Sequence, residues 1–261
     1  MIALVLPAGD KFTPPSSSDF ELPAIFHVGS FAVTKPMLLA VLSAVLITTF
    51  FIAAARKAAI VPGKLQFAGE AVYGFVRNGV ARDVIGHDFL PFVPYLATLF
   101  TFILVNNVFG IFPLLQFPTM ARIGFPAVLA IITWLVFNYI GVKRKGLGTY
   151  FKTMLFPPGV PKIIYILLTP IEFISTVLVR PLTLSLRLFA NMFAGHLLLL
   201  VFVLGGAHLL SKGGFFSAVA PLSFLLGIVL SFFELLVEVL QAYIFTLLTA
   251  LYIAGAIADE H

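Results

Sequence analysis

The segment RPLTLSLRLFANMFAGH, residues 180–196, places two arginines and a histidine inside an otherwise apolar part of the chain. A charged side chain at the centre of a bilayer costs roughly 3 kcal/mol or more, so such a residue normally faces a polar partner, water or a pathway. The guanidinium of Arg187 keeps its proton at every working pH. Arg187 is therefore predicted to act as a fixed positive charge and not as a proton carrier.

The composition around this segment indicates an all-α polytopic membrane protein. Hydrophobic residues make up 61% of the chain and charged residues only 10%, and 29 residues are Phe, which is far too apolar for a soluble domain. The net charge of +5 does not predict nucleic-acid binding, because the basic residues are spread over connecting segments. No cysteine is present, which excludes disulfides and thiolate metal sites.

The hydrophobic segments predict about five membrane crossings, since a helix needs about 20 apolar residues to span the hydrocarbon core. We expect residues 1–261 to form a single membrane domain. Its predicted parts are an exposed tail (1–35), a first span (36–55), an amphipathic surface helix (64–88), a helical hairpin (92–142) and two long antiparallel helices (163–257). Each of these last two is longer than an upright crossing requires, which predicts tilt.

Lysine and arginine residues indicate the orientation. They are most frequent after the first span and after the third span, in residues 56–82 and 143–162. Because basic residues favour the cytoplasmic side, we expect the N-terminus outside and the C-terminal residues 259–261 in the cytoplasm.

Polar residues recur at helical spacing on the last two apolar segments. At 100° per residue, one face of the first carries Glu172, Thr176, Arg180, Arg187 and Asn191, and one face of the second carries Glu234, Glu238 and Gln241. When two helices run antiparallel, one residue from each helix lies at the same depth, and the two residue numbers of every such pair add up to the same sum. Sums of 428 to 430 pair Arg187 with Gln241, Asn191 with Glu238, and His196 with Glu234. Pro181 predicts a kink within the first face.

Two interpretations of these polar residues stay open. Arg187 either acts on something that moves or is neutralised by Glu238 in a structural salt bridge. Asn107 and its neighbour Asn106 either line a polar pathway or form interhelical hydrogen bonds without further function. No Walker loop, dinucleotide fingerprint or metal-spaced histidine cluster occurs in the sequence; we therefore expect no cofactor, no metal and no nucleotide site, and no enzyme activity of the chain alone.

The motifs RLFANM and QAYIFTLL, together with LVNNVFGIFP at residues 104–113, resemble subunit a of the F-type ATP synthases. The resemblance covers most of the chain after the first span. It places Arg187 on the family's essential arginine, Asn191 on the asparagine after it, and Gln241 on the glutamine that neighbours the arginine. Some bacterial members have Glu after Ala-Gly and His on the last helix, whereas this chain has His196 and Glu234. Glu172 lies near a family acidic position, offset by one residue.

The resemblance implies a stationary subunit with two offset half-channels against a rotating c-ring. It implies that Asn107, His196 and Glu234 line the proton inlet, that Glu238 belongs to the same pathway, and that Arg187 switches a ring carboxylate. The implied partners are the c-ring, the peripheral-stalk subunit b, the lipid bilayer and the translocated H⁺, most simply in a bacterial plasma membrane. A proton-coupled secondary transporter and a structural membrane scaffold are the alternatives, although no internal repeat supports the transporter.

Overall fold

A computed structural model describes residues 12, 14–20, 22–29, 31–56, 59–112, 115–156, 161 and 164–258. Five helices in this part of the chain are long and apolar enough to cross a membrane. They are α1 (Lys35–Ala55), the segment Leu90–Val108 with η4 (Leu90–Phe92) and α4 (Val93–Val108), α5 (Gly124–Lys145), the segment Tyr165–Lys212, and α9 (Gly214–Ile257). The predicted all-α polytopic fold with two long C-terminal helices is confirmed. Most of the predicted tail before residue 14, and residues 259–261, lie outside the described residues.

The chain divides into two compact units. Unit 1 contains Met1–Leu46, Phe102–Arg122 and Phe189–Gln241, and unit 2 contains Ile47–Thr101, Ile123–Leu188 and Ala242–His261. Helices α1, α4, α8 (Arg180–Lys212) and α9 each contribute residues to both units.

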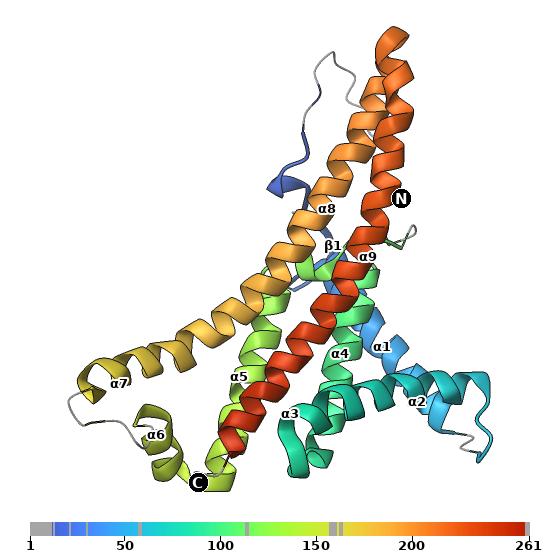
Figure 1. Cartoon of the computed structure of the whole chain (residues 1–261). Coiled ribbons are helices and arrows are strands. Elements are labelled where there is room, and N and C mark those ends of the chain that lie inside the picture. Colours follow the sequence, from blue (N-terminus) through green and yellow to red (C-terminus); the bar gives the residue numbers. More distant parts are fainter. Residues whose placement is uncertain are drawn as a thin grey trace. The chain divides into compact units, whose positions relative to one another are not determined.

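Unit 1 is built on an antiparallel pair formed by the later part of α8 and the earlier part of α9 (Figure 1). Gly213 joins the two helices with a φ of 70°, a conformation that residues with a Cβ atom rarely adopt. A Cβ atom at Gly206 would lie 3.2 Å from the ring of Phe224, and the Ser223 hydroxyl donates to the carbonyl of Phe202 at 2.7 Å. The two helices therefore pack at close range.

The N-terminal part of unit 1 contains a small hairpin that the sequence analysis did not predict. A 3-10 turn, η1 (Ser17–Phe20), precedes β1 (Ala24–Val28), which pairs antiparallel with β2 (Phe31–Thr34). Gly29 turns the chain between the strands with a φ of 62°. In the same unit the side-chain amide of Asn106 on α4 donates to the hydroxyl of Ser43 on α1 at 2.7 Å, so Asn106 forms an interhelical hydrogen bond.

In unit 2 the predicted amphipathic segment is helical and packs through its apolar face. α2 (Lys64–Val76) continues into a π-helix, η2 (Arg77–Arg82), then α3 (Asp83–Ile85) and a 3-10 turn, η3 (Gly86–Asp88). The ring of Phe75 lies 5.5 Å from that of Phe100 on α4 and 5.9 Å from that of Tyr243 on α9. A Cβ atom at Gly69 would lie 2.9 Å from the Cβ atom of Ala54 on α1. The location of this amphipathic segment at a membrane surface stays a prediction.

The short helix α6 (Leu147–Leu155) is held against α5 by one tyrosine. A Cβ atom at Gly141 would lie 2.2 Å from the ring of Tyr150, and the Tyr150 hydroxyl donates to the side-chain oxygen of Asn138 at 3.1 Å. α7 (Tyr165–Ile174) follows, and its Thr169 hydroxyl donates to the carbonyl of Leu155 at 3.1 Å. The absence of a side chain at Gly141 thus creates the site in which Tyr150 packs.

Replacing Gly141 by alanine should loosen this packing, because the new methyl group would overlap the Tyr150 ring. Overpacking of this kind costs about 1–3 kcal/mol. The matched control is Gly148→Ala on α6, where a Cβ atom would meet nothing within 4 Å. The melting temperature of the purified protein should fall for Gly141→Ala and not for Gly148→Ala; equal values for the two variants would contradict the packing described.

Candidate functional site

The first component of the site is a buried pair of titratable side chains in unit 1. The Nδ1 atom of His196 on α8 lies 3.8 Å from Oε1 of Glu234 on α9, and the two residues are only 6% and 5% exposed. The predicted proximity of these residues is confirmed. Because 3.8 Å exceeds hydrogen-bond range, a proton would pass between them through a bridging water or after a small movement.

A second pair joins the same two helices. The side-chain amide of Asn191 donates to the side-chain oxygen of Gln241 at 2.7 Å. The sequence had paired Asn191 with Glu238, which lies three residues earlier on α9. A register based on depth alone ignores the direction in which each side chain points, and this explains the difference. Arg187 belongs to unit 2 and Gln241 to unit 1, and their pairing stays a prediction.

Glu238 faces the end of α4 in unit 1. It is fully buried, and the side-chain amide of Asn107 donates to its backbone carbonyl at 3.3 Å. A Cβ atom at Gly110 would lie 3.3 Å from Oε1 of Glu238 and 2.9 Å from the Cβ atom of Pro118, just before the 3-10 turn η5 (Thr119–Ala121). Gly110 therefore lets the chain after α4 pass close to the carboxyl group, a role that the sequence analysis missed.

Many polar atoms in this part of unit 1 are buried without a hydrogen-bond partner among the described residues. They are Oδ1 of Asn106 and Asn107, Oγ1 of Thr119, Nδ1 of His196, both carboxyl oxygens of Glu234 and of Glu238, and Nε2 of Gln241. Buried polar groups are almost always satisfied by protein or by ordered water. We call Asn107, His196, Glu234, Glu238 and Gln241 the polar cluster, and its chemistry fits a hydrated interior.

Phe20 covers part of the polar cluster. Its ring centroid lies 5.8 Å from that of His196, with an interplanar angle of 71°, and Phe20 is 4% exposed. The sequence offered one signal for this contact, a single large aromatic residue within the polar run SSSDFE. That signal is too common to identify a partner.

The second component of the site is the exposed face of α8 that carries Arg187. The neighbouring Leu184 and Leu188 in unit 2 are 2% and 0% exposed, whereas Arg187 is exposed. In unit 1, Ala190, Asn191 and Ala194 of α8 are also exposed. Unit 2 thus presents the fixed charge of Arg187 on its surface.

The polar stripe predicted before Arg187 is interrupted at a π-helix, η6 (Ser175–Val179). Pro181 has no N–H to donate to the carbonyl four residues earlier, and the N–H of Arg180 donates to the carbonyl of Ser175, five residues earlier. The extra residue rotates the helix phase by about one residue step. The half-buried Glu172 and the buried Thr176 therefore do not continue the stripe, and the single-stripe prediction is wrong.

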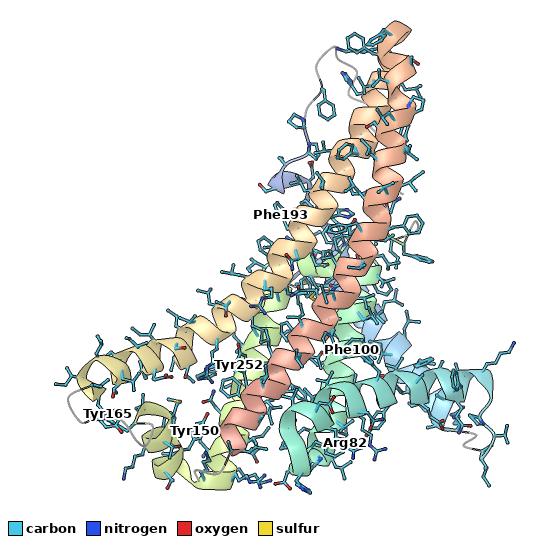
Figure 2. The ribbon with its side chains drawn as sticks, in the orientation of Figure 1. Arg82, Phe100, Tyr150, Tyr165, Phe193 and Tyr252 are labelled. Carbon is cyan, nitrogen blue, oxygen red and sulfur yellow. The ribbon has the colours of Figure 1, made fainter. Side chains whose placement is uncertain are left out.

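Arg180 is held by an aromatic ring in unit 2. Its guanidinium lies over the ring of Tyr252 on α9, 5.4 Å from the centroid. Tyr252 is labelled in Figure 2. In the same unit the indole N–H of Trp134 donates to the carbonyl of Thr176 at 2.9 Å. Among the described residues, no group of three or more His, Cys, Asp or Glu side chains is able to hold a metal ion.

Comparisons with known proteins agree with one another. The model of the family described as ATP synthase A chain matches residues 37–254. The chain is 51% identical to ATP synthase subunit a of Nocardioides sp., over 97% of this chain and 96% of the relative. It is also 51% identical to ATP synthase subunit a of Pseudarthrobacter chlorophenolicus over the whole of both chains, and 42% identical to that of Streptomyces lividans over 97% and 90%.

The geometry of the buried pair predicts a specific disulfide. A Cβ atom at Gly195 would lie 3.6 Å from Cγ of Glu234, so cysteines introduced by Gly195→Cys and Glu234→Cys should bond when membranes are oxidised. Gly205→Cys with Glu234→Cys is the control, since residue 205 lies roughly 15 Å further along α8. The chain has no cysteine of its own, so gel mobility with and without reductant measures the bond directly. Equal cross-linking of both pairs would contradict the helix register.

Proposed function

From the premise that the chain belongs to the ATP synthase A chain family, we propose that it is the stationary subunit that conducts protons past a rotating ring of c subunits. It is a multi-pass membrane protein. The observation that carries the proposal is the buried His196–Glu234 pair beside carboxyl oxygens that no described protein group satisfies. Titratable groups that are out of contact with bulk solvent, but need water, are suited to passing protons through an apolar region.

The polar cluster is the inlet in this proposal. Protons from outside pass Asn107 and the His196–Glu234 pair, and Glu238 extends the route between α4 and α9. An imidazole and a carboxyl group exchange protons readily, because the imidazole titrates near neutral pH. Asn191 and Gln241, joined at 2.7 Å, hold α8 and α9 together at the adjoining level.

Arg187 is the electrostatic switch. A neighbouring cation favours the ionised form of a carboxylic acid, so a ring carboxylate releases its proton beside Arg187 and binds another after it has moved away. The same positive charge opposes a direct leak of protons past the ring. The proposal is supported by the exposure of Arg187 in unit 2, which leaves the guanidinium accessible to another subunit.

The outlet and the remaining partners rest on the resemblance. We assign Glu172, half-buried on α7, to the release pathway, and the peripheral-stalk subunit b and the lipid bilayer to the other surfaces. The membrane is a bacterial plasma membrane, with the N-terminus outside and the C-terminus in the cytoplasm. A potential of 100 mV provides about 2.3 kcal/mol per proton, so several protons must pass for each ATP made elsewhere in the complex.

Arg187→Ala should abolish proton-driven ATP synthesis while the subunit still assembles, because the fixed charge is lost. Arg187→Lys should also fail to restore normal synthesis, since an ammonium group sheds its proton more readily and lacks the planar fork. Lys212→Ala removes an exposed charge at the end of the same helix and should have no effect. ATP synthesis by inverted membrane vesicles measures all three; normal synthesis with either Arg187 variant would exclude the switch.

Exchanging the buried pair should preserve much of its function. His196→Glu alone places two carboxyl groups together, and Glu234→His alone places two imidazoles together, so each should slow proton entry. The double exchange restores one acid and one imidazole. Coupling between contacting residues is commonly about 0.5–3 kcal/mol, so the recovery is measurable as proton uptake by vesicles. If the double variant loses as much as the two single losses combined, the two residues do not act as a pair.

A further inference from the structure

Phe20 is anchored in unit 1 by a short turn in the N-terminal segment. The backbone N–H of Ser16 donates to the carboxylate of Asp19 at 2.8 Å, and the N–H of Asp19 donates to the carbonyl of Ser16. This reciprocal pair closes the turn immediately before Phe20. Asp19 is exposed, whereas Phe20 is 4% exposed, so the turn directs the aromatic ring into the protein.

The ring completes a row of aromatic side chains along one face of α8. Phe189, Phe193 and His196 follow one another at spacings that share a helix face, and the first two rings stack with centroids 5.4 Å apart. The ring centroid of Phe20 lies 4.7 Å from that of Phe193 and 5.8 Å from that of His196. Phe117, from the segment after α4, approaches Phe20 at 6.3 Å.

Among the described residues, the imidazole of His196 lies next to an aromatic ring and a carboxyl group. The ring of Phe20 meets the imidazole at 71°, a near edge-to-face geometry that aromatic pairs favour. The Nδ1 atom of the imidazole lies 3.8 Å from Oε1 of Glu234. A buried aromatic ring excludes water from the side it covers, so the Phe20 ring restricts the approach of solvent to the imidazole.

We propose that Phe20 is a positioning residue for proton entry, which holds the imidazole of His196 in register with the Glu234 carboxyl group. The N-terminal segment thereby forms part of the inlet wall. This inference rests on the proposed function, because it assumes that the His196–Glu234 pair carries protons.

The chain contains a matched contact that serves as a control. Phe12, from the same N-terminal segment, lies 5.5 Å from the ring of His208 on the same helix. The two contacts have the same chemistry and nearly the same distance. His208 lies twelve residues beyond His196 and has no carboxylate within ion-pair distance among the described residues. A general effect of loosening the N-terminal segment should therefore appear at Phe12 as well as at Phe20.

The test is proton uptake by vesicles that carry the whole complex, with the amount of assembled subunit measured in each preparation. Phe20→Leu keeps an apolar side chain but removes the ring. Proton uptake should slow about 2- to 10-fold, because the free energy of an aromatic pair corresponds to a rate factor of this size. Phe20→Tyr retains the ring and should stay close to the wild type. Phe12→Leu should be unchanged.

A double variant separates positioning from a purely structural role. If Phe20 acts through the pair, Phe20→Leu should slow uptake little further when Glu234→Gln has already removed the acid. Full additivity, or a Phe20→Leu variant as fast as Phe12→Leu, would overturn the proposal. If Phe20→Leu does not assemble, Phe20→Met replaces it in the same comparison. Proton-driven ATP synthesis by Arg187→Ala vesicles is measured in parallel: normal synthesis there contradicts the proposed function, whereas lost synthesis there with normal uptake by the Phe20 variants contradicts only this inference.

Discussion

Two carboxyl groups buried among apolar helices set the main constraint on unit 1. Glu234 and Glu238 are 5% and 0% exposed, and burying an ionisable group without partners costs several kcal/mol. Side chains on the neighbouring helices offset part of this free-energy cost. His196 stands beside the first carboxyl group, and Asn107 tethers the backbone at the second. The remaining carboxyl oxygens have no hydrogen-bond partner among the described residues, and the proposed proton route would satisfy them with water.

The buried groups and the exposed arginine divide the chemistry between them. In the proposed mechanism His196 and Glu234 carry the protons, and the helices of unit 1 place the two side chains next to each other. Arg187 does not titrate, and it lies on a face of α8 that neighbouring segments of its unit leave exposed. In the proposed mechanism this permanent charge acts on a group outside the chain.

The fold and the buried pair could be predicted because they depend on periodicity. Apolar segments of spanning length identify the helices, and the spacing of His196 and Glu234 in antiparallel helices identifies the pair. The Asn191–Gln241 bond was missed because depth alone does not give the direction of a side chain. The π-helix before Arg180 depends on how the backbone accommodates Pro181, and several local conformations satisfy that requirement. Phe20 was missed because its partners lie far away in sequence, in α8 and after α4.

The pairing also explains why the acid and the imidazole can stand on either helix. Some members of the resembling family carry Glu on the first long helix and His on the second, the reverse of this chain. What the interior requires is one acid and one imidazole at the same depth, since each then moderates the cost of charging the other. Gly195 makes room on α8 for the side chain at residue 234 of α9. A Cβ atom at Gly195 would lie 3.5 Å from Oε1 of Glu234, which is ordinary contact distance. In the proposed mechanism the pair acts as a unit, and the identity of the helix that supplies each member is secondary.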